Sequence, residues 1–172
     1  SFDTPLMTSN INAFGTLRIL EAIRHYSRNT KFYQASTSEM FGGHKDEKFQ
    51  NELSRFRPRS PYAVSKLYSH WITDIYREGY NLFCCSGILF NHESPIRGEE
   101  FVTKKIVSGL CKIKFARGKA LEVGNIYSKR DWGYAKDYVE IMWKMLQQKK
   151  PDDYVISTGQ TYTIKEFINR SC

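Results

Sequence analysis

Apolar residues recur along the chain with two different spacings. Apolar positions three or four residues apart predict amphipathic helices at residues 8–27, 61–79 and 101–115, and one that follows Trp132 and runs to about residue 148. Short apolar runs predict strands at residues 31–36, 82–90, 121–124 and 154–157. A last helix is expected after Thr163, whose hydroxyl can cap its first turn.

Helices that alternate with strands predict an α/β fold with a mostly parallel sheet. Residues 82–90 are apolar at nearly every position, which is typical of a strand buried on both faces. In such sheets, ligands bind at the carboxyl ends of the strands. The groups Thr37-Ser38-Glu39 and Asn91-His92-Glu93 each follow a predicted strand, so we expect both at this edge of the sheet.

The stretch Ser60-Pro61-Tyr62-Ala63-Val64-Ser65-Lys66 opens the second predicted helix. If Ser60 caps the helix and Pro61 takes its first turn, Tyr62 and Lys66 lie side by side on one face. An adjacent ammonium group favours the phenolate, so the pair could transfer protons. The spacing alone favours an ordinary surface pair on an amphipathic helix. The predicted convergence of polar strand ends near the helix start favours the first interpretation.

The net charge of +8 is concentrated in one segment. Residues 101–130 hold eight lysines and arginines, and Glu122 is the only acid among them. Such a segment fits a nucleic-acid face, a pocket for a phosphorylated small molecule, or a solvated helix face. Because exposed aromatic residues do not interleave with the basic ones, we expect no nucleic-acid partner.

The cysteines and the hydropathy of the chain indicate the cellular compartment in which we expect the protein. The four cysteines form no CxxC motif, which suits a reducing cytosol and makes a metal site an unfavoured interpretation. No apolar run approaches the ~20 residues that a membrane helix needs, and no charged-then-apolar leader is visible. We therefore expect a cytoplasmic protein with no metal and no membrane partner.

Several phrases of the sequence resemble, in order, the extended short-chain dehydrogenase/reductases and, within them, the GDP-mannose 4,6-dehydratases. These phrases are FYQASTSE, RSPYAVSKLY, GILFNHESP, RGEEFVTKKI and RDWGYAKDYV. The resemblance implies a partial Rossmann-like doubly wound parallel sheet. It further implies a nucleotide-binding domain at residues 1–92 and 131–159, and parts of a smaller substrate-binding domain at residues 93–130 and 160–172.

The resemblance also implies a lyase reaction, in which GDP-mannose becomes GDP-4-keto-6-deoxy-mannose by transient hydride transfer through NADP. Tyr62 would take the proton of the sugar 4-hydroxyl, Lys66 would hold the phenolate and bind the nicotinamide ribose, and Thr37 would hydrogen-bond the 4-oxygen. Glu39 would then remove the C5 proton of the 4-keto sugar and help to expel the 6-hydroxyl as water.

Binding residues follow from the same resemblance. His92 and Arg97, with Tyr62 and Lys66, would contact the cofactor. Substrate contacts would come from Thr37, Asn91, Lys105 and Arg130. Arg130 is expected on the diphosphate, where a guanidinium binds bidentately. His92 taken alone fits a core histidine as well.

Two alternative functions stay open at this point. One is a nucleotide-sugar epimerase or reductase that uses the same tyrosine, and the other is a non-catalytic α/β binding module. Glu39 favours the dehydratase, because epimerases need no elimination and usually lack an acid at this place.

The sequence departs from the family pattern at two places. No GxGxxG phosphate loop occurs among the eleven glycines, so we expect the chain to start within the nucleotide-binding domain. Whether it binds NADP by itself is left open. Met7 stands where the family pattern has a tyrosine near the cofactor, so we do not expect this cofactor contact in the present chain.

An oligomer is implied as well. In this family the helices at residues 8–27 and 61–79 would pair with their copies across a twofold axis. We therefore expect a homodimer or a dimer of dimers.

Overall fold

The computed structural model describes residues 1–43, 49–115, 118 and 120–172. The chain divides into two compact units, one formed by residues 1–90 and 138–156 and the other by residues 91–137 and 157–172. Which unit binds nucleotide and which binds sugar remains a prediction. No helix in the described part of the chain is both long and apolar enough to cross a bilayer.

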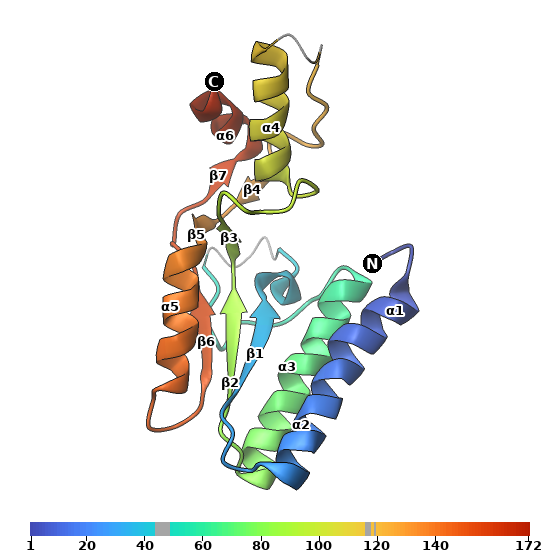
Figure 1. Ribbon diagram of the computed structural model, residues 1–172, viewed down its shortest axis with the longest axis vertical. Helices are drawn as coiled ribbons and strands as arrows, with labels where there is room; N and C mark the ends of the chain where they lie inside the picture. The colour runs from blue at the N-terminus through green and yellow to red at the C-terminus, as the bar shows by residue number, and fades with distance from the viewer. Residues whose placement is uncertain (44–48, 116–117, 119) are drawn as a thin grey trace. The chain divides into compact units, whose positions relative to one another are not determined.

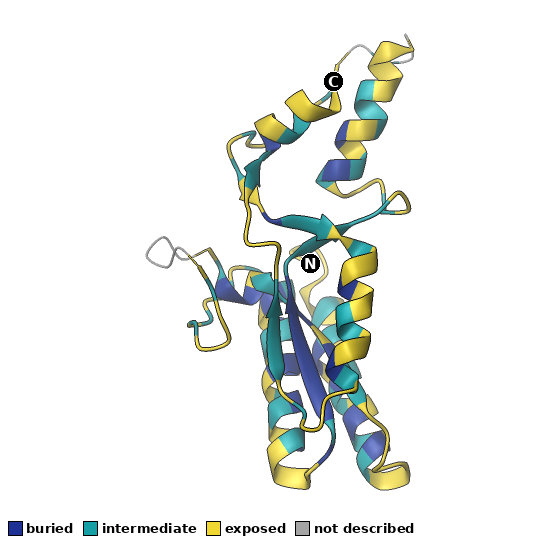
Figure 2. Ribbon diagram, turned by 90° about the vertical axis from the view of Figure 1, so that its left-hand side faces the viewer, coloured by how far each residue is buried: buried dark blue, intermediate teal, exposed yellow. Residues whose placement is uncertain are grey.

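The first unit is built on a parallel sheet (Figure 1). Its strands, in the spatial order β1-β2-β6, are β1 (Phe32–Thr37), β2 (Cys84–Leu89) and β6 (Asp153–Ile156). The central strand β2 is buried at every position, as Figure 2 shows in dark blue. The predicted parallel α/β sheet and the predicted buried strand are therefore confirmed.

Helices cover both faces of this sheet (Figure 1). They are α1 (Pro5–Ser9), α2 (Gly15–Tyr26), α3 (Pro61–Tyr80) and α5 (Ala135–Leu146). Cys84 of β2 clusters with Leu20 of α2 and Tyr76 of α3. The next residue, Cys85, points to the opposite face, where its Sγ lies 3.6 Å from the carbonyl oxygen of Met145 in α5.

The first helical stretch contains a feature that the apolar spacing did not predict. It starts at Pro5 rather than residue 8, because proline suits the first turn, and a π-helical turn (Asn10–Phe14) separates α1 from α2. Within this turn the carbonyl of Asn12 accepts hydrogen bonds from the hydroxyls of Thr16, at 2.9 Å, and Ser69, at 2.7 Å. The turn thereby ties this helix to α3.

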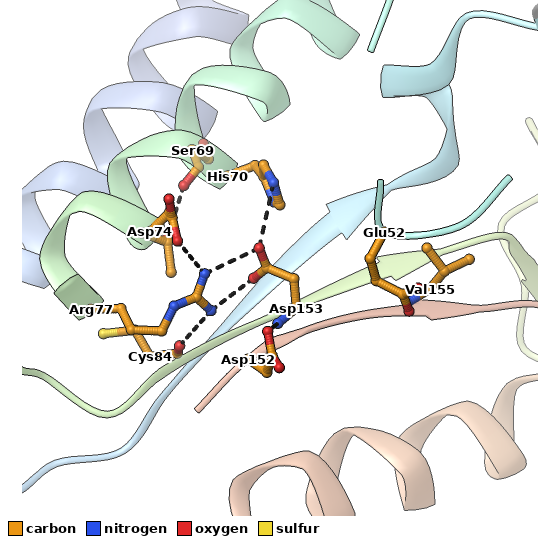
Figure 3. A network of polar contacts seen from close by, with 10 residues as sticks. Glu52, Ser69, His70, Asp74, Arg77, Cys84, Asp152, Asp153 and Val155 are labelled. Carbon is orange, nitrogen blue, oxygen red and sulfur yellow. Dashed lines mark hydrogen bonds and ion pairs between the residues drawn. The ribbon is translucent and has the colours of Figure 1, made fainter. Parts of the chain in front are cut away.

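A polar network anchors the other half of α3 (Figure 3). Arg77 donates to both carboxylate oxygens of Asp153 in β6, at 2.9 and 3.1 Å, and to the carbonyl of Cys84, at 3.2 Å. Burial lowers the pKa of Arg77, but hydrogen bonds to Asp153 and Asp74 outweigh it and raise the pKa above its usual value. The network holds α3 on the sheet.

The outer edge of β6 is also capped by a side chain (Figure 3). Glu52 Oε1 accepts a hydrogen bond of 2.7 Å from the backbone N–H of Val155. An unpaired N–H at a sheet edge is a template for pairing with another chain, and this carboxylate occupies it.

The second unit contains short strands and two helices. Strand β3 (Asn91–Glu93) pairs in parallel with β5 (Trp132–Tyr134), and β4 (Lys129–Arg130) pairs antiparallel with β7 (Tyr162–Thr163). The helices are α4 (Val102–Lys114) and α6 (Ile164–Ser171). Thr163 and Glu166 form a capping box at α6, which confirms the predicted cap.

The predicted strand at residues 121–124 is wrong. This stretch is irregular, and Leu121 packs against α4, where a Cβ added at Gly109 would lie 2.5 Å from the leucine Cδ1. Residues 129–130, and not residues 121–124, form the strand of this stretch, which pairs with β7. The helix expected after Trp132 begins only at Ala135, because residues 132–134 form β5.

Candidate active site

Thr37 and Glu39 lie at the carboxyl end of β1. Thr37 is the last residue of the strand, and its Oγ1 accepts a hydrogen bond of 3.3 Å from the Glu39 backbone N–H. This bond caps a 3-10 turn (Ser38–Phe41) in which Met40 and Phe41 are buried. The buried pair fixes the turn, and the carboxylate of Glu39 stays exposed.

A close backbone approach holds the turn from the other side. Gly42 has a φ of +67°, and a Cβ at this residue would lie 1.8 Å from the carbonyl oxygen of Arg57. The N–H of Arg57 donates to the carbonyl of Met40 at 2.8 Å, and the rings of Phe41 and Phe56 stack with centroids 5.3 Å apart. The loop therefore returns to the base of the Glu39 turn before α3 begins.

The first turn of α3 presents Tyr62 as predicted. Ser60 caps the helix, since its Oγ accepts a hydrogen bond of 3.1 Å from the Ala63 N–H, and Pro61 occupies the first turn. The Lys66 Nζ lies 5.8 Å from the centroid of the Tyr62 ring. The predicted placement of Tyr62 and Lys66 side by side on one face of this helix is confirmed.

Lys66 also joins α3 to β1. Its Nζ donates a hydrogen bond of 2.9 Å to the carbonyl of Ala35, two residues before Thr37. Burial lowers the pKa of Lys66, and no described carboxylate lies within ion-pair distance of its ammonium group. A half-buried cation without an acidic partner is suited to stabilise a negative charge that forms beside it.

The remaining predicted site residues belong to the second unit. Asn91 Nδ2 donates to the Asp131 carbonyl at 3.3 Å, and His92 is half-buried in the middle of β3. Arg97 lies in the loop after β3, near Glu93.

Two further predicted residues of this unit are exposed. Lys105 lies on α4, and Arg130 lies in β4, where it donates to its neighbouring carbonyl, that of Lys129, at 2.8 Å. Lys112 and Lys114 are exposed at the end of α4, and Arg117 and Lys119 lie outside the described residues. The convergence of the two sets of predicted residues on one crevice remains a prediction.

Sequence reasoning gave no role to two acidic residues beside predicted site residues. Asp131 is only 4% exposed, and its carboxylate accepts hydrogen bonds from the backbone N–H groups of Thr158 and Gly159 at 3.0–3.1 Å. Glu93 contacts both Thr103 and Arg97. Their signals in the sequence were the place of Glu93 in the polar group after a predicted strand and the position of both residues inside the phrases NHESP and RDWGY.

A parallel sheet with helices on both faces, and a tyrosine–lysine pair at the start of one helix, define a Rossmann-type fold of the short-chain dehydrogenase/reductase class. Solved structures agree with this class. RMD from Pseudomonas aeruginosa, complexed with NADPH, superposes with a TM-score of 0.91 at 26% identity, over 98% of this chain and 59% of that chain. A dTDP-glucose 4,6-dehydratase from Bacillus anthracis, in complex with NAD, gives 0.85 at 25% identity, over 95% and 51%.

Sequence comparison defines the family more narrowly. A family model described as GDP-mannose 4,6 dehydratase matches residues 1–172, so the chain belongs to the GDP-mannose 4,6-dehydratase family. The GDP-mannose 4,6-dehydratase of Vibrio cholerae is 54% identical over 99% of this chain and 46% of its own length. That of Drosophila melanogaster is 55% identical over 98% and 43%. The chain spans slightly less than half the length of these relatives. The predicted family and fold class are confirmed.

Proposed function

We propose that this chain forms part of an NADP-dependent lyase that dehydrates GDP-mannose to GDP-4-keto-6-deoxy-mannose. The observation that carries the proposal is the hydrogen bond from Lys66 to Ala35, because it fixes the tyrosine helix to the strand that ends at Thr37 and Glu39. The names of the relatives and the NADPH in the RMD complex support the substrate and the cofactor.

Tyr62 and Lys66 would carry out the first proton transfer. The Tyr62 phenolate, stabilised by the ammonium of Lys66, would accept the proton of the sugar 4-hydroxyl and become the phenol. Thr37 would hold the 4-oxygen by a hydrogen bond. Its own Oγ1 accepts from the Glu39 N–H, which leaves the hydroxyl proton for donation to the substrate.

Glu39 would perform the elimination. A ketone at C4 acidifies the C5 hydrogen, and an exposed carboxylate on a fixed turn can remove it and pass a proton to the departing 6-hydroxyl. The cofactor NADP, when bound, supplies transient storage of the hydride between C4 and C6.

The side chains present fit such a cofactor. The only hydrogen-bond acceptor that the described residues offer to Lys66 Nζ is one carbonyl, so two of its three donors remain for the hydroxyls of a ribose. His92 and Arg97 are proposed as further cofactor contacts. We assign residues 1–92 and 131–159 to nucleotide binding.

The substrate would be held by Asn91, Lys105 and Arg130, together with Thr37. The exposed cations of residues 93–130 suit a diphosphate, and we assign this stretch and residues 160–172 to sugar-nucleotide binding. The cysteines Cys84 and Cys85 are buried free thiols, which supports a reducing compartment, and we propose the cytoplasm.

Glu39→Gln is expected to reduce dehydration of GDP-mannose by about 10²-fold or more in the full-length protein, because the amide cannot remove the C5 proton. Oxidation at C4 should still occur, so the reduced cofactor should accumulate and its absorbance should rise. The 4-keto-6-deoxy product is measured by its absorbance in alkali, which an epimerase product lacks.

Glu78→Gln is the matched control for this variant, because Glu78 is exposed in α3 and contacts none of the described residues of the site. It should dehydrate GDP-mannose at the wild-type rate. A Glu39→Gln protein that retains full dehydration would exclude Glu39 as the base.

We also propose that the helices at residues 8–27 and 61–79 form a homodimer or dimer-of-dimers interface. Large apolar side chains remain exposed on both helices, and the rings of Phe14 and Tyr68 lie 6.1 Å apart between them. Among the described residues this helix patch comprises Leu6, Met7, Ile11, Phe14, Val64, Tyr68, Trp71 and Ile75. An apolar patch that spans two helices is typical of a subunit interface.

Ile75→Glu is expected to convert the oligomer to monomers, since it places a charge at a residue that is 55% exposed in the helix patch. Sedimentation velocity of the full-length protein measures the change. Val139→Glu, at a similarly exposed residue of α5, should leave the oligomer intact. A compact wild-type monomer would contradict the proposed interface.

A further inference from the structure

The guanidinium of Arg97 is held by two neighbouring side chains. Its Nε atom lies 3.4 Å from Oε2 of Glu93, in an ion pair whose side chains are only 26% and 20% exposed. Its central carbon lies 3.5 Å from the centroid of the Phe101 ring, so the group rests on the aromatic face. The carboxylate of Glu93 thus attracts one edge of the guanidinium by charge, without a hydrogen bond to the buried Nε, and the Phe101 ring supports one face.

The opposite edge carries the Nη1 and Nη2 atoms. No described residue accepts a hydrogen bond from either of them. Leaving donors of a partly buried cation without acceptors costs free energy, unless water or a ligand supplies the acceptors. Two parallel N–H groups on a guanidinium edge match two oxygens of a phosphate group.

We propose that Glu93 is a positioning residue that holds Arg97, so that its Nη1–Nη2 edge meets a phosphate of a bound nucleotide. The inference rests on the proposed function, in which Arg97 contacts the cofactor. Both NADP and GDP-mannose carry phosphate groups, and the chemistry of this edge suits either source.

Glu93 acts on more than the arginine. The Thr103 hydroxyl donates to the same carboxylate atom, Oε2, at 2.6 Å, and Thr103 is buried in the first turn of α4. The loop between them is closed by backbone hydrogen bonds from Arg97 to Ser94, at 3.0 Å, and from Phe101 to Gly98, at 3.2 Å. One carboxylate therefore sets the place of Arg97 relative to α4.

Glu93→Gln separates the charge of this residue from its shape, because the glutamine oxygen still accepts the Thr103 hydrogen bond. We expect roughly tenfold weaker binding of NADPH or of GDP to the full-length protein, since Arg97 loses its orientation. NADPH binding is measured by protein fluorescence, and GDP binding by calorimetry. A loss confined to NADPH assigns the phosphate to the cofactor, and a loss confined to GDP assigns it to the substrate.

Two variants serve as controls. Thr103→Val keeps the ion pair and removes only the tie to α4, and Glu99→Gln removes an exposed charge two residues from Arg97. Both should bind each nucleotide within about twofold of wild type.

The outcomes separate the inference from the proposed function. Wild-type affinities in Glu93→Gln, or an equal loss in Thr103→Val, would overturn the positioning role. Wild-type protein that binds NADPH and GDP but forms no keto sugar contradicts the proposed function alone. Wild-type protein that binds neither nucleotide overturns both.

Discussion

Replacing Tyr62 with phenylalanine is expected to reduce turnover of GDP-mannose by about 10²–10⁴-fold. Phenylalanine keeps the ring in the first turn of α3, and Lys66 keeps its 2.9 Å hydrogen bond to Ala35, so the helix should stay in place. Only the hydroxyl that takes the proton is lost. Because that step comes first, absorbance of the reduced cofactor should not rise, in contrast to Glu39→Gln.

Tyr26→Phe is the matched control, since Tyr26 ends α2 and is 89% exposed. Its turnover should equal that of the wild type in the same assay of alkali absorbance. If Tyr62→Phe also turned over at the wild-type rate, the proton-transfer role of the tyrosine and the mechanism built on it would be wrong.

Gly42→Ala is expected to lower the free energy of unfolding by about 3 kcal/mol or more. Two costs combine at this residue. The φ of +67° disfavours any side chain, and the new methyl group would lie 1.8 Å from the carbonyl oxygen of Arg57, where the backbone must shift. Urea denaturation measures the loss. Turnover should fall as well, because the turn that carries Glu39 ends at Gly42.

Gly43→Ala separates these two costs. Gly43 has nearly the same φ, +66°, but among the described residues, its chain neighbours apart, no atom lies within 4 Å of an added Cβ. It should lose only about 1 kcal/mol, which is the backbone cost alone. Equal losses in the two variants would show that the approach of Arg57 to Gly42 contributes nothing to stability.

Elements whose signals are local could be predicted from the sequence. The cap at Ser60, the proline after it and the apolar spacing that follows act within a few residues, and α3 has the predicted start. The capping box at Thr163 is local in the same way. The Tyr62–Lys66 face follows from helix geometry, so this part of the candidate site was predictable as well.

Features that depend on distant partners could not be predicted. Strand β4 exists because β7 pairs with it, and two-residue strands carry no periodicity. Leu121 was predicted to lie in a strand, but its side chain packs against α4 at Gly109. The contacts of Lys66 with Ala35, and of Glu93 with Arg97 and Thr103, likewise depend on how separate elements pack.

The interruption of the first unit by the second has a consequence for synthesis on the ribosome. Strand β2 is buried at every position, yet its partner β6 is separated from it by the whole stretch of residues 91–137 and most of α5. At a translation rate of about 5–20 residues per second, the unpaired edge of β2 waits roughly 3–13 seconds for β6 to be made. During this interval the unpaired strand edge and the apolar surface beside it are open to misassociation with other chains.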